Sequence, residues 1–153
     1  DALGARLGAS AGRQDSNVGM EFLAKDTDKA LAILDDVLKN PLFGEDELKR
    51  LVARRLDNIK AAKDQPQMAV RQHFDAYFFG KEHPYGKPMM GDEAALAQIT
   101  RAEVEAFHKK QFVGRNLIVT VTGDFDPKTI EAKMKGLVGT LPAGEAYAWK
   151  KYP

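Results

Sequence analysis

The sequence of residues 7–22 reads LGASAGRQDSNVGMEF and decides how the fold begins. Larger and smaller side chains alternate along Leu7–Ala11, and alternation returns from Val18 to Phe22, which is the period of a β-strand. Residues 12–16 between the two stretches supply glycine and polar residues suited to a turn. The pattern therefore predicts a hairpin of two strands, near residues 5–12 and 16–24. Because its side chains are so small, the first strand packs weakly and its backbone is easy to approach.

Helical patterns fill much of the chain beyond this hairpin. Thr27 is a plausible N-cap for the first helix, and Thr100 with Glu103 matches the capping box. Asp126-Pro127 combines an N-cap with proline at the first helical position. The patterns predict helices over residues 28–39, 45–62, 67–79, 93–98, 101–111 and 127–138.

One further stretch has the composition of a strand. Leu117–Thr122 is rich in β-branched residues and is typical of a buried strand. Three strands with five or six helices predict an α+β fold, in which helices cover one sheet.

Length, charge and cysteine content exclude several classes of protein. The chain has 153 residues, enough for one ordinary domain with an apolar core. Its formal net charge of +1 argues against a dedicated nucleic-acid binder. No apolar run approaches the roughly 18 residues that span a membrane. The absence of cysteine excludes disulfides, thiolate–zinc sites and cysteine nucleophiles.

Three histidines, His73, His83 and His108, are the candidates for imidazole chemistry. Zinc hydrolases need ligands at fixed spacings, such as two histidines one helical turn apart, and none of the three has such a partner. Glu105 precedes His108 by one turn of a predicted helix, a pair that is typical of a surface contact. The residues themselves therefore predict no metal site and no cofactor in this chain.

Tyr85 lies in the turn His83-Pro84-Tyr85-Gly86, within a loop rich in glycine and proline. Two roles are open for it: donating a hydrogen bond to a substrate, or closing the edge of the core. We favour the second, because Pro84 fixes the backbone there.

Several short motifs follow one another in a specific order: Asn40-Pro-Leu-Phe43, Glu47-Leu48, Asp64-Gln65-Pro66, Phe79-Gly80, His83-Pro-Tyr-Gly86, Gly91, Ile99-Thr100, Asn116 and Gly123-Asp124. The ordered set covers about residues 2–140 and resembles the M16 (pitrilysin-type) zinc peptidase family. That family includes mitochondrial processing peptidase, the core subunits of respiratory complex III and many bacterial zinc proteases.

The resemblance implies an M16 metallopeptidase-like (LuxS/MPP-like) domain over residues 1–140, with an antiparallel sheet flanked by helices, and a linker over 141–153. Active members bind zinc through an inverted motif, His-x-x-Glu-His, and a distant glutamate on a later helix. The motif is not in this chain, and family spacing puts it roughly twenty residues before Asp1. We therefore expect a piece of a longer polypeptide, lacking the N-terminal strand and zinc-motif segment of its domain.

The distant glutamate has a definable place in this sequence. Counting from Phe43 and from Pro66, it falls on Asn58, which Asp57 precedes. An asparagine amide is neutral and a poor zinc ligand beside a carboxylate. Asp57 lies about 100° around the helix and has a side chain one methylene shorter than glutamate. The sequence thus departs from the active pattern at the one metal position that it contains.

Two functions follow from this departure. In the first, the chain is a non-catalytic M16 domain that contributes peptide-binding chamber surface and subunit pairing, or a plain scaffold like the complex III core proteins. In the second, it belongs to an active zinc metalloendopeptidase whose His-x-x-Glu-His motif lies upstream. We favour the first.

The first strand is the candidate substrate-binding element. Small side chains let an extended peptide approach an edge strand and pair with it. The alternative is that Ala9 and Ala11 simply pack under a helix. The candidate residues are Leu7, Gly8, Ala9, Ser10 and Ala11. Expected partners are a peptide or protein substrate and another M16 domain or subunit, with no nucleic acid and no membrane span. Bacterial relatives are often periplasmic, and the resemblance favours the periplasm over the cytoplasm without fixing the compartment.

Overall fold

The computed structural model describes residues 4–149, 151 and 152, and the chain divides into two compact units. The first unit takes in residues 1–42 and 106–149, and the second residues 43–105 and 150–153. The expected α+β fold is confirmed: the protein is rich in helices and has a small antiparallel sheet.

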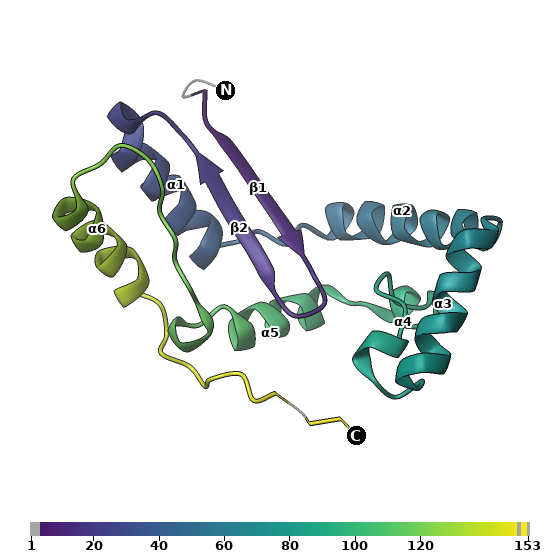
Figure 1. Ribbon diagram of the computed structural model, residues 1–153. Coiled ribbons are helices and arrows are strands. Elements are labelled where there is room, and N and C mark those ends of the chain that lie inside the picture. Colours follow the sequence, from purple (N-terminus) through teal and green to yellow (C-terminus); the bar gives the residue numbers. More distant parts are fainter. Residues whose placement is uncertain (1–3, 150, 153) are drawn as a thin grey trace. The chain divides into compact units, whose positions relative to one another are not determined.

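The first unit opens with the predicted hairpin. Strands β1 (Arg6–Ala11) and β2 (Ser16–Glu21) run antiparallel, with Leu7 opposite Met20 and Ala9 opposite Val18 (Figure 1). All of β1 is exposed, whereas Val18 and Met20 are half-buried. The predicted hairpin is confirmed, and the small residues 8–11 of β1 are exposed.

The helices of the first unit enclose a small core. They are η1 (Ala24–Asp26), α1 (Thr27–Lys39), η3 (Gly114–Asn116) and α6 (Pro127–Gly139), together with the second half of α5 (Arg101–Gln111). The buried apolar side chains are Ala30, Leu38, Val113 and Leu137. An ion pair between Asp28 and Lys133 joins α1 to α6.

Local side-chain caps set where several helices begin. Asp126 accepts a hydrogen bond from the backbone N–H of Thr129 (2.8 Å) at the start of α6, which confirms that predicted cap. The Thr129 hydroxyl also donates to Asp126, and these bonds lower the pKa of the Asp126 carboxyl. The predicted cap at Thr27 is wrong: Thr27 is the first residue of α1, and its hydroxyl donates to the carbonyl of Ala24 (2.6 Å).

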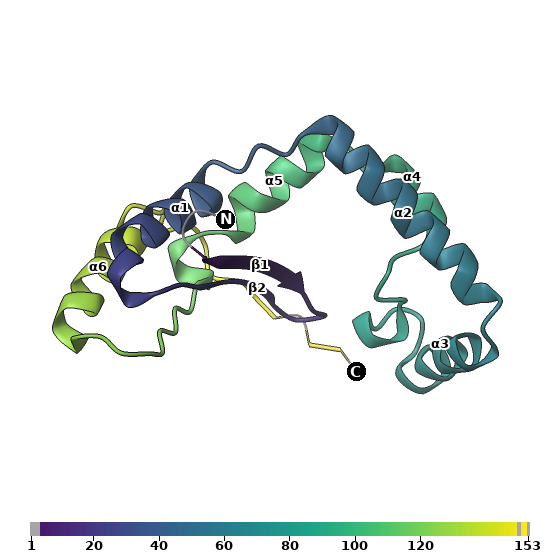
Figure 2. The ribbon, with the colours of Figure 1, turned by 90° about the horizontal axis from the view of Figure 1, so that it is seen from above.

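The second unit consists of helices. They are α2 (Glu45–Lys63), α3 (Pro66–Phe79), η2 (Pro84–Gly86), α4 (Glu93–Gln98) and the start of α5. Figure 2 shows α4 running beside α2, with α3 near the end of α2. The capping box at the start of α5 is confirmed, since Thr100 N–H donates to Glu103 (2.8 Å) and Glu103 N–H donates to the Thr100 hydroxyl (3.3 Å). Donation from Thr100 lowers the pKa of the Glu103 carboxyl. No helix in the described parts of the chain is long and apolar enough to cross a membrane.

The predicted strand at Leu117–Thr122 is not formed. In the described residues the sheet contains β1 and β2 alone, so this stretch has no strand to pair with. Ile118 is 90% exposed, although the stretch in which it lies has the composition of a buried strand. β-Branched composition indicates that a stretch suits a strand, but the ladder of hydrogen bonds must come from a partner elsewhere.

The stretch after α6 lies against the residues that follow α5. Gly114 N–H donates to the Pro142 carbonyl (2.8 Å), and Arg115 N–H donates to the Ala143 carbonyl (3.1 Å). Gly144 has φ +62°, and a Cβ there would lie 2.4 Å from Cβ of Val113. These contacts place residues 142–144 on the first unit, while the linker over 141–153 stays a prediction.

Gly86 offers a test of close packing in the second unit. A Cβ at this position would lie 2.0 Å from the Gly80 carbonyl oxygen. We expect Gly86→Ala to destabilise this unit by about 1–3 kcal/mol, because the backbone must move to admit the methyl group. Faster amide hydrogen exchange around η2 would report the change.

Gly136→Ala is the matched control for that substitution. Gly136 lies within α6, and a Cβ there meets nothing within 4 Å. Alanine should therefore stabilise the first unit by roughly 0.5–1 kcal/mol. Equal effects of the two alanines would contradict the packing argument.

Candidate functional site

Asn58 lies on an exposed flank of α2, and Asp57 beside it is also exposed. Neither side chain forms a hydrogen bond or an ion pair within the described residues. Arg54 and Arg55 stand one helical turn earlier and are likewise exposed. A divalent cation at this flank would meet a neutral amide, the single carboxylate of Asp57 and two guanidinium groups, a set that disfavours metal binding.

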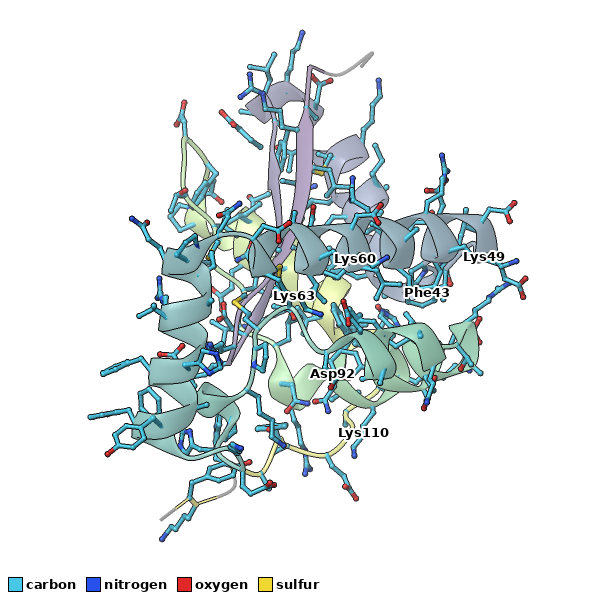
Figure 3. The ribbon with its side chains drawn as sticks, turned by 90° about the vertical axis from the view of Figure 1, so that its right-hand side faces the viewer. Phe43, Lys49, Lys60, Lys63, Asp92 and Lys110 are labelled. Atoms are coloured by element: carbon cyan, nitrogen blue, oxygen red, sulfur yellow. The ribbon has the colours of Figure 1, made fainter. Side chains whose placement is uncertain are left out.

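His73 lines a hollow of about 460 Å³ in the second unit. Lys63 and Asp92, both labelled in Figure 3, also line it, and the Lys63 ammonium is 3.0 Å from both carboxylate oxygens of Glu93. Asp92 is engaged as the N-cap of α4, since it accepts from Ala95 N–H (2.8 Å). The Lys63–Glu93 ion pair therefore joins α2 to α4, while Asp92 caps the start of α4.

His83 belongs to an aromatic cluster. Its Nδ1 accepts a hydrogen bond from the backbone N–H of Tyr85 (3.1 Å), which makes His83 the cap of η2. Its ring stacks on Phe79 (centroids 5.5 Å apart) and meets Tyr152 edge to face (4.8 Å). Tyr85 packs edge to face against Phe79 (5.4 Å). This arrangement supports packing, rather than substrate binding, as the role of Tyr85.

His108 stabilises the end of α1. Its Nε2 lies 3.0 Å from the carbonyl oxygen of Leu38, one of the acceptors that a helix end leaves without an internal partner. Its ring stacks on Phe112 (4.6 Å). Glu105, the neighbour expected from sequence, instead binds Arg101 (2.7 Å). His108 thus has a structural use in the first unit.

The predicted site residues do not converge on a metal site. In residues 4–149, 151 and 152, no three histidine, aspartate or glutamate side chains stand close enough to share an ion.

The candidate edge strand is open on one side. In the described part of the chain β1 pairs with β2 alone, so its other edge carries unpaired backbone groups. Residues Leu7–Ala11 are exposed along their whole length. Such an edge can accept an added strand through its backbone.

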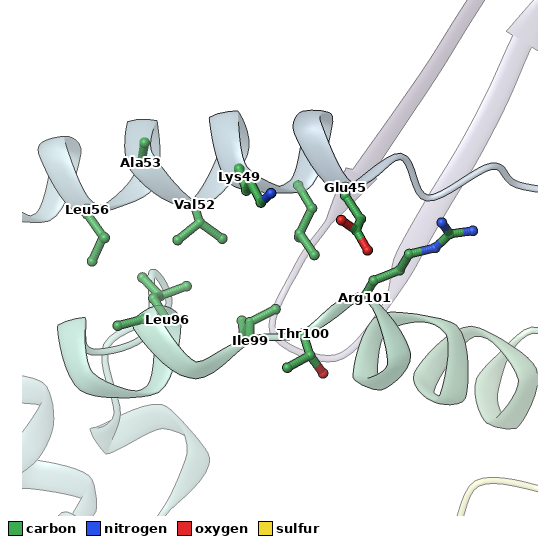
Figure 4. A pocket seen from close by; sticks show the side chains of 11 residues that line it. Glu45, Lys49, Val52, Ala53, Leu56, Leu96, Ile99, Thr100 and Arg101 are labelled. Atoms are coloured by element: carbon green, nitrogen blue, oxygen red, sulfur yellow. The ribbon is translucent and has the colours of Figure 1, made fainter.

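A second hollow, of about 440 Å³, lies between α2 and α4. Figure 4 shows Val52 and Leu56 of α2 facing Leu96 and Ile99 across it. Sequence analysis missed this hollow. The apolar spacing of α2 identifies the face of the helix that packs, but it does not show how completely a neighbouring element covers that face.

Comparison with known proteins adds a family and a fold. The family model described as "Insulinase (Peptidase family M16)" matches residues 1–93, and the model "Peptidase M16 inactive domain" matches residues 98–153. A solved structure described as the peptidase M16 inactive domain from Pseudomonas fluorescens superposes with a TM-score of 0.89 at 27% identity. It matches 99% of this chain and 37% of that chain.

Curated relatives carry the names of proteases. An "Uncharacterized zinc protease" of Rickettsia felis is 28% identical over 145 residues, which are 95% of this chain and 35% of the relative. One of Mycobacterium tuberculosis is 26% identical over 140 residues, 92% of this chain and 32% of the relative. Mitochondrial-processing peptidase subunit alpha-1 of Dictyostelium discoideum is 27% identical over 124 residues, 80% of this chain and 19% of that subunit. The chain spans about a third of the length of the zinc proteases that it matches.

The exposed amide at position 58 generates a prediction about zinc. We expect this chain to retain no stoichiometric zinc after dialysis, because Asn58 is neutral and no three acidic or histidine side chains of the described residues could share an ion. Metal analysis by mass spectrometry measures this. Asn58→Glu in the same chain is the control, and it should also bind none, because a single carboxylate does not make a site. One tightly held zinc per chain in either protein would contradict the account.

Proposed function

The chain belongs to the M16 peptidase family, and from that premise we propose that it is part of a non-catalytic M16 domain. In this proposal it contributes peptide-binding surface and pairs with another M16 domain or subunit. The observation that carries the proposal is Asn58, a neutral amide at the position where the family resemblance places a zinc-ligating glutamate. The match of residues 98–153 to the inactive-domain model supports it.

The open edge of β1 would bind the peptide. An added peptide strand gains backbone hydrogen bonds, and it requires that the side chains of the edge strand be small enough not to obstruct it. Gly8, Ala9, Ser10 and Ala11 meet that need, and all are exposed. Pairing with another M16 domain is supported by a relative that is named as a subunit of mitochondrial-processing peptidase.

The alternative is an active zinc metalloendopeptidase, to which this chain would contribute one segment. The names of the Rickettsia and Mycobacterium relatives favour it. Its catalytic His-x-x-Glu-His motif would have to lie upstream, and Asp57 would have to replace the missing glutamate. The side chain of Asp57 points about 100° away around α2, so this alternative needs a local change in the helix.

The domain limits are part of the same proposal. Residues 1–140 form the M16-type domain, and residues 141–153 are the linker that leads out of it. The linker would be fastened at its beginning, where Pro142 and Ala143 accept backbone hydrogen bonds.

Binding at β1 is testable with a labelled, extended peptide in fluorescence anisotropy. We expect Ala9→Trp to weaken binding about tenfold, which is about 1.4 kcal/mol, because the indole obstructs the approach to the open edge. Asn17→Trp on β2 is the control, since it adds the same bulk to the neighbouring strand. Equal losses from both variants, or no loss from either, would count against β1 as the binding edge.

The choice between the two functions is testable at position 58 in a protein that carries an intact upstream motif. There Asn58→Glu should raise zinc affinity by at least tenfold, because it completes the ligand set with an anionic oxygen. Competition with a zinc chelator measures the affinity, and Asn58→Gln is the isosteric control. Unchanged affinity would show that Asn58 does not occupy the ligand position.

A further inference from the structure

Residues 117–122, Leu-Ile-Val-Thr-Val-Thr, have the composition of a strand without the pairing of one. Figure 1 draws the stretch as a plain line between α5 and α6. Leu117 is extended, with φ −99° and ψ 134°, and its N–H donates to the Gly114 carbonyl (3.4 Å). Among the described residues, the backbone groups of residues 118–122 form no hydrogen bond with other protein groups. Gly123 ends the stretch, because its φ of +141° does not suit a strand of L-residues.

Exposure alternates along this stretch. Leu117 and Val121 are half-buried, whereas Ile118, Thr120 and Thr122 are exposed, Ile118 to 90%. Side chains two apart share a face of an extended chain, so the odd-numbered residues face the first unit and the even-numbered ones face water. The unpaired backbone groups lie between these two faces, where a neighbouring strand would bond to them. Such a row of groups is a template for an added strand.

The side chains of the stretch decide which strand fits. None of the six is charged, and five of the six are β-branched. β-Branched side chains pair well across neighbouring strands, and uncharged segments of this kind without proline or glycine pair with identical segments. The same stretch of a second copy has this composition, and two copies meet without any like-charge repulsion.

Symmetry fixes how two such stretches would pair. The two-fold axis of a symmetric antiparallel pair stands perpendicular to the sheet, so it keeps each side chain on its own face. Each residue therefore opposes one of the same parity, and one residue lies at the centre. Because the Leu117 N–H is already used and Gly123 ends the stretch, the unpaired run is residues 118–122 and its centre is Thr120.

We propose that residues 118–122 are a self-association edge, which pairs antiparallel with the same residues of a second copy of this chain. Thr120 opposes Thr120 of the second copy, Val119 opposes Val121, and Ile118 opposes Thr122. Hydroxyl groups opposed in this way can bond to each other across the strands. This pairing goes beyond the proposed function and involves neither Asn58 nor the open edge of β1.

A disulfide between copies tests the pairing and its register. The chain contains no cysteine, so a single introduced cysteine can form a disulfide only with a second copy. Thr120 is exposed, and opposed Cα atoms of an antiparallel pair are about 4.5–5.5 Å apart, within reach of a disulfide. With oxidised glutathione as the oxidant, we expect Thr120→Cys to give a disulfide-linked dimer on a non-reducing gel.

Thr122→Cys is the matched control, because it makes the same substitution on the same exposed face. In the proposed register its two copies lie four residues apart along the strands, about 14 Å, which exceeds the roughly 7 Å that a disulfide spans. The yield of linked dimer from Thr120→Cys should be at least tenfold higher. Equal yields, or a higher yield from Thr122→Cys, would overturn the proposal.

Sedimentation velocity tests the association without a covalent bond. We expect the unaltered chain to form a dimer whose fraction rises with protein concentration. Thr120→Lys should weaken dimerisation at least tenfold, because two ammonium groups then oppose each other. Tyr77→Lys adds the same charge to α3 at a side chain that is 91% exposed, and it should leave dimerisation unchanged. A chain that stays monomeric, a dimer that survives Thr120→Lys, or loss of the dimer with Tyr77→Lys alone would each contradict the pairing of residues 118–122.

Discussion

Burial of apolar surface is the constraint on which this structure depends. A chain of this size gains its stability from side chains removed from water, and here the buried set is Ala30, Leu38, Val113 and Leu137. All four lie in the first unit, where Gly144 closes on Val113 and the Leu38 carbonyl is bonded by His108. The second unit is ordered by helix caps, an aromatic cluster and the Lys63–Glu93 ion pair instead. Exposed ion pairs contribute little to stability. The second unit therefore depends more than the first on having its apolar surface covered.

The sequence predicts the elements whose causes are local. Capping by Asp126 and by the Thr100–Glu103 pair depends on residues three apart, so the helices begin where those residues stand. The hairpin is equally local, because its strands are joined by a short turn. The stretch Leu117–Thr122 shows the limit. Its composition suits a strand, but pairing depends on a partner distant in sequence, and composition does not reveal whether that partner is present.

The candidate site also has some features that the sequence reveals and others that depend on tertiary packing. The prediction for position 58 comes from motif order between Phe43 and Pro66, and the structure adds that the residue is exposed on α2 beside one carboxylate and two arginines. The contacts of the histidine side chains could not be predicted from the sequence. His108 meets Leu38, which is distant in the chain, and no spacing rule connects them. The apolar spacing of α3 is also visible in the sequence, but whether that face is covered depends on tertiary packing.

A shared fold does not carry a shared activity to this chain. The TM-score of 0.89 shows that the backbone of this chain follows the same path as that of the Pseudomonas fluorescens structure. That path depends on apolar patterning and helix caps, which tolerate many substitutions. Zinc hydrolysis depends instead on a few anionic or imidazole groups held at one point. Asn58 differs from glutamate by one methylene and a charge, a change too small to alter α2, although at a zinc-ligand position it would remove an anionic oxygen. A family can therefore keep its architecture in members whose chemistry differs, because the residues that set the backbone path are not the residues that hold a metal.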